Sequence, residues 1–171
     1  SNTTIDPIKL SNILGTLKKQ SVEHVIMEAS SHGLQQNRLD GLFFNTGIFT
    51  NLSQDHLDYH KNIKNYLEAK LYLFKKLIKK NGNIITDKNI PEFKKIKNIA
   101  SDKNLNLFSL LDKKNNFQFL SHQYEGESQL LEIRCNNLIH KVKLNLIGKV
   151  QLNNFLMAVI ASINSNINIE D

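Results

Sequence analysis

The densest group of side chains capable of chemistry lies in residues 28–38, EASSHGLQQNR. Within eleven residues the chain places a carboxylate, two hydroxyls, an imidazole, an amide and a guanidinium: Glu28, Ser30, Ser31, His32, Gln36 and Arg38. The apolar run HVIMEA at residues 24–29 predicts a short buried strand leading into this group. Ligands of open α/β sheets bind beyond the C-terminal ends of strands, so we expect a binding site here. A polar loop that caps a helix is the alternative.

A second polar group, TNLSQDHLDYH at residues 50–60, follows another predicted strand at residues 47–50. If the two strands end side by side, Glu28 and His56 come within reach of one site. A carboxylate and an imidazole, together with phosphate oxygens of a nucleotide, suit Mg²⁺.

Two other kinds of chemistry fit these two polar groups less well. His56 and His60 are four residues apart, as in a zinc-binding HExxH motif, but Leu57 stands where that motif needs Glu. A catalytic triad of Ser30 or Ser31 with His32 lacks the Gly-x-Ser-x-Gly turn that exposes a nucleophile.

The elements that must position these groups follow from hydrophobic periodicity. Asp6-Pro7 predicts the start of a helix that ends near residue 19. Further helices are predicted at residues 65–80, 91–100 and 152–163, and further strands at residues 83–86 and 106–110. Period-two alternation predicts an antiparallel meander of strands at residues 117–124, 129–134 and 139–147. Together these elements predict an α/β domain whose sheet is parallel in its core and antiparallel on one flank.

Lys70 lies on the predicted helix 65–80, one turn after Tyr66. The apolar face of that helix carries Leu67, Leu71, Phe74, Leu77 and Ile78. Spacing alone therefore predicts that Lys70 is a solvated surface lysine.

Composition excludes several classes of protein. The chain has 171 residues, 40% of them hydrophobic, and a net charge of +6 from 22 Lys+Arg and 16 Asp+Glu. The lysines are scattered in pairs without interleaved aromatic residues, which predicts a solvated surface and no nucleic-acid partner. The apolar runs are too short to insert into a membrane. The lone Cys135 cannot form an internal disulfide, which predicts a cytoplasmic protein with Cys135 buried in a strand.

Three stretches of the sequence resemble the central domain of the Mur ligases. They are NTT at residues 2–4, MEASSHGLQQNRLDG at residues 27–41 and FTNLSQDHLDYHKNIKNYLEAKLYLF at residues 49–74. The resemblance implies a mainly parallel sheet of the P-loop NTPase type flanked by helices, truncated at its N-terminus, with an antiparallel β flank. It implies an α/β part over residues 1–111, a meander over 116–147 and an adenine-side segment over 148–171.

The resemblance also implies roles for single residues. Contacts to a UDP-muramoyl-dipeptide are implied for Asn2, Thr3, Thr4, Ser30, Gln36 and Arg38. Magnesium ligands are implied at Glu28, His56 and Lys70, with catalytic roles for His56 and for Lys70, which is carbamylated in the family. The segment GKVQLNN at residues 148–154 implies that Gln151 and Asn154 approach the adenine of ATP, although Val150 stands where the family has an aromatic residue.

The implied reaction is the ATP- and Mg²⁺-dependent addition of a third amino acid, diaminopimelate or lysine, to UDP-N-acetylmuramoyl-L-alanyl-D-glutamate in peptidoglycan synthesis. The carboxylate would be activated as an acyl phosphate. The 171 residues contain no G-x-x-x-x-G-K-[ST] phosphate loop, so we expect a fragment of a longer ligase that is inactive without its N- and C-terminal domains. A folylpolyglutamate synthetase or a cyanophycin-type ligase, and an inactive domain that binds a nucleotide sugar or a partner chain, are the alternatives.

Overall fold

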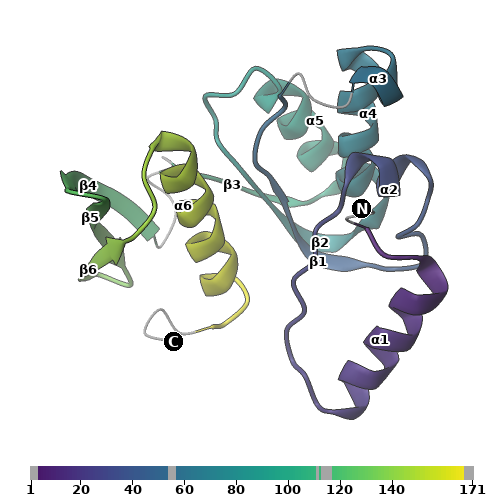
Figure 1. The fold of residues 1–171 in the computed structure, drawn as a ribbon, viewed down its shortest axis with the longest axis horizontal. Coiled ribbons are helices and arrows are strands. Elements are labelled where there is room, and N and C mark those ends of the chain that lie inside the picture. Colours follow the sequence, from purple (N-terminus) through teal and green to yellow (C-terminus); the bar gives the residue numbers. More distant parts are fainter. Residues whose placement is uncertain (1–3, 54–56, 111, 113–116, 168–171) are drawn as a thin grey trace. The chain divides into compact units, whose positions relative to one another are not determined.

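The computed structural model describes residues 4–53, 57–110, 112 and 117–167. The chain forms two compact units. The first comprises Ser1–Phe44 and Leu52–Lys79, and the second comprises Asn45–Asn51 and Lys80–Asp171. Figure 1 shows the elements of both units along the chain.

The first unit is helical. It contains α1 (Pro7–Lys19), α2 (Ser31–Gln35), α3 (Leu57–His60) and α4 (Ile63–Tyr72), which continues into the π-helical turn η1 (Leu73–Leu77). The predicted start of α1 is confirmed: the Asp6 carboxylate accepts hydrogen bonds from the backbone N–H groups of Ile8 and Lys9 at 3.0 and 3.3 Å. The short helices α2 and α3 were not predicted.

The predicted helix 65–80 is displaced by a few residues. Asn62 caps α4 by accepting a hydrogen bond from the backbone N–H of Asn65 at 2.9 Å, and the helical turns end at Leu77. The predicted apolar face is confirmed, since Leu67, Leu71, Phe74 and Leu77 are buried. Residues 78–80 instead begin strand β2 (Ile78–Thr86), because pairing within a sheet overrides local helix propensity.

The predicted strand at residues 24–29 is wrong. The structure assigns no helix or strand to residues 22–30, and the side chains of Val25 and Ile26 are 48% and 93% exposed. An apolar run forms a strand only where a neighbouring strand satisfies its backbone N–H and C=O groups. Within the described residues the sheet of this region contains only β1, β2 and β3.

The second unit contains most of that sheet. Strands β1 (Phe44–Phe49), β2 and β3 (Asn106–Ser109) lie in the order β1-β2-β3, and β2 pairs with β3 in parallel, with Asn83 opposite Asn106. The crossover between β2 and β3 contains α5 (Phe93–Lys103), which buries Ile96 and Ala100. The strands predicted at residues 47–50, 83–86 and 106–110 are therefore confirmed, and the helix predicted at 91–100 begins two residues later.

The predicted antiparallel meander is also confirmed. Strands β4 (Phe117–Glu125), β5 (Ser128–Cys135) and β6 (Leu138–Leu144) pair in sequence order. Asn136 and Asn137 both have positive φ and join β5 to β6 in a two-residue turn, a conformation that Asn tolerates well.

Helix α6 (Lys149–Ile163) packs against this antiparallel sheet, and the two lie side by side in Figure 1. Their shared core is apolar and includes Ile85 of β2. Its buried residues are Ile85, Leu110, Phe117, Leu131, Ile133, Leu144, Leu152, Leu156, Met157 and Ile160. The lone Cys135 is buried at the end of β5, as predicted.

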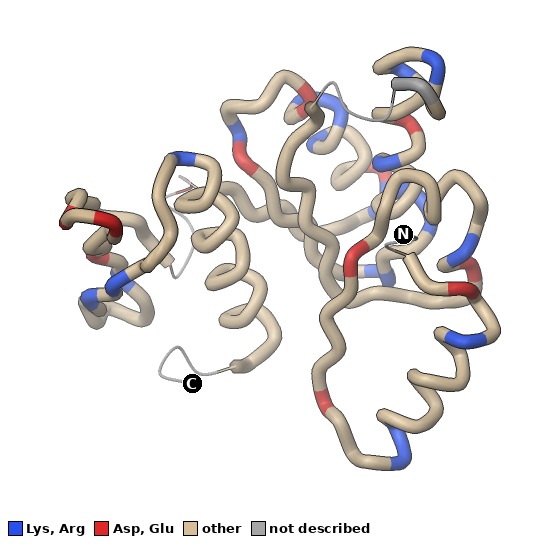
Figure 2. The backbone as a smooth tube through the Cα atoms, in the orientation of Figure 1, with Lys and Arg blue, Asp and Glu red and all other residues tan. Residues whose placement is uncertain are grey.

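Figure 2 marks basic and acidic residues along the backbone of both units. Among the helices of the described residues, none is long and apolar enough to cross a lipid bilayer.

Candidate functional site

Thr4 is the centre of a hydrogen-bonded cluster in the first unit. Its side chain is almost fully buried, and Thr4 Oγ1 accepts a hydrogen bond from the Ser30 backbone N–H at 3.0 Å. The two hydroxyl oxygens of Thr4 and Ser30 lie 2.6 Å apart. The Arg38 guanidinium donates from Nη1 to the main-chain oxygen of Thr4 at 3.0 Å. Three predicted substrate-binding residues are thus in direct contact, although 34 positions separate Thr4 from Arg38.

Gly33 allows this close approach. A Cβ atom at Gly33 would lie 2.6 Å from Cβ and Oγ1 of Thr4, a distance at which one residue must shift. The Gly33 backbone N–H donates to Ser30 Oγ at 3.1 Å, which caps α2. We call Thr4, Ser30, Gly33 and Arg38 the Thr4 cluster. Gly33 was not singled out from the sequence, although a glycine within a helix is a signal of close backbone approach.

The two polar groups of the sequence meet in this unit. Gln36 Nε2 donates a hydrogen bond to the Tyr59 hydroxyl at 2.8 Å, and the rings of His32 and Tyr59 lie with centroids 4.0 Å apart. Gln36 is exposed, so its amide faces solvent as well as Tyr59. The contact joins residues 28–38 to residues 50–60, through Gln36, His32 and Tyr59, whereas the expected pairing of Glu28 with His56 rested on a strand that does not form and on a residue outside the described part of the chain.

His60 occupies a buried position between three helices. His60 Nε2 and Ser31 Oγ lie 2.9 Å apart and share a hydrogen bond. The His60 ring stacks on the Tyr66 ring, with centroids 4.9 Å apart and an interplanar angle of 18°. Spacing in the sequence suggests His60 only as a zinc ligand, because its packing role depends on contacts with residues distant in sequence.

Lys70 and Glu28 are the described residues implied to bind magnesium, and only Glu28 carries the oxygen atoms that Mg²⁺ prefers as ligands. Lys70 is half-buried on α4, and its Nζ lies 5.1 Å from the centroid of the Tyr66 ring. Glu28 lies in the irregular segment before α2 with its side chain exposed. Of the other implied residues, Asn2, Thr3 and His56 lie outside the described part of the chain. Within the described part, no three His, Cys, Asp or Glu side chains are grouped closely enough to hold a metal ion.

The residues implied to approach adenine belong to the second unit. Gln151 is exposed and Asn154 is half-buried, both near the start of α6. Between them, Asn153 Nδ2 donates to Asp87 Oδ2 at 3.3 Å. Asp87 directly follows β2 and also accepts from the backbone and side chain of Asn89. Through this hydrogen bond, Asp87 holds the first turns of α6 near the C-terminal end of β2.

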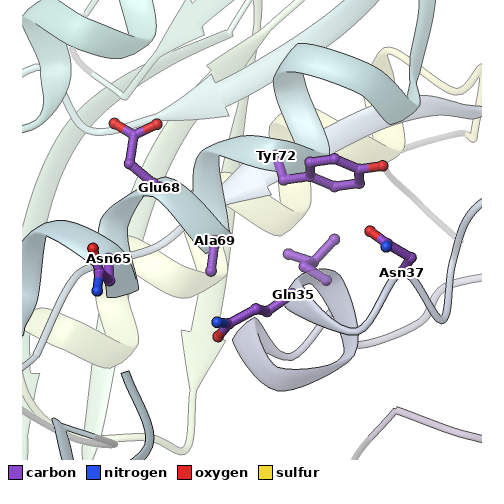
Figure 3. A pocket seen from close by; sticks show the side chains of 7 residues that line it. Gln35, Asn37, Asn65, Glu68, Ala69 and Tyr72 are labelled. Carbon is purple, nitrogen blue, oxygen red and sulfur yellow. The ribbon is translucent and has the colours of Figure 1, made fainter. Parts of the chain in front are cut away.

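A pocket of about 310 Å³ lies between α2 and α4 in the first unit (Figure 3). Its lining is rich in amides: Leu34, Gln35, Asn37, Asn65, Glu68, Ala69 and Tyr72. At its rim the Tyr72 hydroxyl donates to both carboxylate oxygens of Asp40 at 3.0 Å, and this hydrogen bond raises the pKa of Tyr72. Of the predicted site residues that the structure describes, none lines this pocket.

A helix-flanked parallel sheet followed by an antiparallel sheet defines an α/β domain with an appended β unit. The chain belongs to the Mur ligase family: the "Mur ligase middle domain" matches residues 1–162. The resemblance seen in the sequence is thereby confirmed.

A curated relative from Brucella melitensis biotype 1, "UDP-N-acetylmuramoyl-L-alanyl-D-glutamate--2,6-diaminopimelate ligase", is 38% identical over 159 residues. That match covers 92% of this chain and 32% of the relative. A relative of the same name from Rickettsia typhi is 36% identical over 160 residues. The chain therefore spans about a third of the length of these relatives.

Solved structures show the same fold. A structure titled "Structure of UDP-N-acetylmuramoyl-L-alanyl-D-glutamate--2, 6-diaminopimelate ligase" superposes with a TM-score of 0.80 at 26% identity, covering 97% of this chain and 34% of that one. A MurF ligase from Thermotoga maritima in complex with ADP gives a TM-score of 0.59 at 15% identity, covering 82% of this chain and 31% of that one.

Proposed function

We propose that residues 1–171 form the central part of an ATP-dependent ligase that adds diaminopimelate or lysine to UDP-N-acetylmuramoyl-L-alanyl-D-glutamate in peptidoglycan synthesis. The observation that carries the proposal is the Thr4 cluster, which joins Thr4, Ser30 and Arg38 through hydrogen bonds of 2.6–3.0 Å. These are residues whose motifs match substrate contacts of the family. The names of the relatives support the same substrate.

Arg38 is the main anion-binding residue of this proposal. One guanidinium N–H is used on the main-chain oxygen of Thr4, which holds the group next to the Thr4 cluster. The remaining N–H groups form a fork that can bind a carboxylate or phosphate of the UDP-linked substrate. Ser30 and Gln36, together with Asn2 and Thr3, supply hydroxyls and amides for its neutral parts, and the buried Thr4 hydroxyl holds Ser30 in place.

Magnesium binding is assigned to Glu28, His56 and Lys70. A carboxylate fits the preference of Mg²⁺ for oxygen ligands, whereas a lysine ammonium does not. Lys70 fits once its neutral amine has attacked CO₂: a nitrogen–carbon bond forms, a proton leaves the nitrogen, and a carbamate with carboxylate oxygens results. When bound, Mg²⁺ supplies charge neutralisation of the phosphate oxygens.

The nucleotide is assigned to the second unit, where Gln151 and Asn154 would contact the adenine of ATP. Asp87 supports this assignment because its hydrogen bond to Asn153 fixes the turn of α6 that carries both residues. Use of ATP and the lone cysteine favour a cytoplasmic enzyme whose other domains complete the site.

The proposal is tested with the full-length ligase that contains residues 1–171. ADP formation is measured with ATP, Mg²⁺, the UDP-muramoyl-dipeptide and either diaminopimelate or lysine. We expect turnover only when the UDP substrate and one of the amino acids are both present. The 171-residue chain alone should show none, because it lacks a phosphate loop to hold the β- and γ-phosphates. ADP formation that does not depend on the UDP substrate would contradict the proposal.

A further inference from the structure

His60 is only 1% exposed, although its imidazole is polar. We propose that His60 is a positioning residue, which orients the Thr4 cluster for binding of the UDP-linked substrate through its hydrogen bond to Ser31. This inference rests on the proposed function. No metal ion, change of charge or proton transfer is assigned to His60.

His60 contacts the start of α2 through Ser31. Ser31 is the first residue of α2, and its side chain is 4% exposed, so the 2.9 Å hydrogen bond to His60 Nε2 lies away from water. A buried hydrogen bond is costly to break, because the group left behind loses a partner that water cannot replace. Ser31 directly follows Ser30, whose hydroxyl lies 2.6 Å from that of Thr4. A shift of Ser31 therefore moves the Thr4 cluster.

Neighbouring side chains hold the imidazole of His60 in one orientation. Tyr66 stacks on one side of the ring, and Tyr59 packs edge-on, with centroids 5.0 Å apart and an interplanar angle of 86°. Asn65 Nδ2 donates to the main-chain oxygen of His60 at 3.2 Å, which holds the backbone. Because both ring and backbone are held, Nε2 has a fixed direction toward Ser31.

His60 also contacts α4, through its stacking on Tyr66. Tyr66 lies one turn before Lys70, whose Nζ is 5.1 Å from the Tyr66 centroid on that helix. The same imidazole therefore contacts the start of α2 and the helix of Lys70. An apolar residue could fill the space of His60, but it could not hold Ser31 by a directed hydrogen bond. This difference separates a positioning role from packing alone.

The test uses the full-length ligase with the variants Ser31→Ala, His60→Phe and His60→Gln. Equilibrium binding of the UDP-muramoyl-dipeptide is measured by calorimetry without ATP, together with KM for each substrate. Ser31→Ala and His60→Phe should each raise the Kd and KM for the UDP substrate roughly 5- to 30-fold, with KM for ATP unchanged. His60→Gln keeps a side-chain donor and acceptor and should recover part of the loss. The double variant Ser31→Ala/His60→Phe should raise the Kd no further than either single variant does, because each single variant already removes the same hydrogen bond.

Tyr72→Phe is the matched control, since it removes a hydrogen bond to Asp40 in the same unit without touching the Thr4 cluster. It should leave binding of the UDP substrate unchanged. Unaltered binding in Ser31→Ala, or an equal loss for ATP and the UDP substrate, would overturn the inference alone. If His60→Phe does not fold, Ser31→Ala and His60→Gln decide the question. A wild-type ligase that fails to bind the UDP substrate would overturn the proposed function and this inference with it.

Discussion

Two regions of the molecule bury side chains of opposite character. Around Thr4, the first unit buries hydroxyls and main-chain groups that are connected by hydrogen bonds of 2.6–3.1 Å. Around Ile133, the second unit buries aliphatic and aromatic side chains between the antiparallel sheet and α6. The stability of the first region depends on the directions of its hydrogen bonds, and that of the second depends on how well side-chain volume fills the core.

This difference predicts how each region responds to substitution. A buried polar group left without a partner costs about 1–3 kcal/mol, because hydrogen bonds require particular directions. An apolar core tolerates exchanges that conserve volume for less than about 1.5 kcal/mol. Substitutions near Thr4 should therefore change substrate use, whereas substitutions near Ile133 should change stability.

The largest effect is expected at Lys70, on the helix that adjoins the polar region. In the full-length ligase, Lys70→Ala should abolish most activity, and added short carboxylic acids should partly restore it by replacing the carbamate oxygens. Lys70→Arg should not be conservative, since a guanidinium stays cationic. Steady-state rates of ADP formation measure both effects. Full activity in Lys70→Arg would show that Lys70 is a surface lysine and not part of the site.

The apolar region is probed at Ile133, which is fully buried. Ile133→Ala should lower the free energy of unfolding by about 2–5 kcal/mol, and the matched control Ile133→Val by about 0.5–1.5 kcal/mol. Urea unfolding measures the loss. The folded fraction of Ile133→Ala should keep the wild-type KM for the UDP substrate. A raised KM in folded protein would break the distinction between the two regions.

Two glycines compare a crowded position with an open one. Gly33→Ala forces a Cβ against the Thr4 side chain at 2.6 Å and should cost about 1–3 kcal/mol while weakening use of the UDP substrate. At Gly15, inside α1, a new Cβ would meet no other described part of the chain within 4 Å beyond its own helix backbone, so Gly15→Ala should stabilise the protein by about 0.5–1 kcal/mol. Thermal unfolding and KM are measured for both. Equal effects of the two substitutions would mean that the contact between Gly33 and Thr4 does not constrain the site.

The smallest effect is expected at Cys135. Burial raises the pKa of its thiol, so the folded protein holds this proton more tightly than the unfolded chain does. The stabilisation is complete well below the pKa of a free thiol, about 8.5, and is lost as the pH rises from there through the raised pKa of the folded state. Urea midpoints of the wild type should fall slightly more at alkaline pH than those of Cys135→Ala. Rapid alkylation of the thiol in the folded protein would show that it is not buried.

Local signals in the sequence predicted a large part of the fold. Asp6 and Pro7 define the start of α1 through contacts within three residues, and Asn136-Asn137 defines a turn by its own conformation. These elements require no information from distant parts of the chain.

The elements that sequence analysis missed depend on distant contacts. The cap of α2 at Ser30 is held by Thr4, 26 residues away, and His60 meets Ser31 across 29 residues. Residues 24–29 have the apolar composition of a strand, but composition does not say whether a neighbouring strand is present. For the site, the resemblance implied roles for Thr4, Ser30 and Arg38. The structure adds Gly33 and His60, which lie in the same motifs but whose roles depend on contacts with residues distant in sequence.

The central claim is that the Thr4 cluster binds the UDP-linked substrate, and Arg38→Ala in the full-length ligase tests it most directly. Steady-state kinetics are measured with the UDP-muramoyl-dipeptide and ATP varied separately. Loss of the guanidinium fork should cost about 1.5–3 kcal/mol in kcat/KM for the UDP substrate, with KM for ATP near the wild-type value. An effect confined to ATP would contradict the claim.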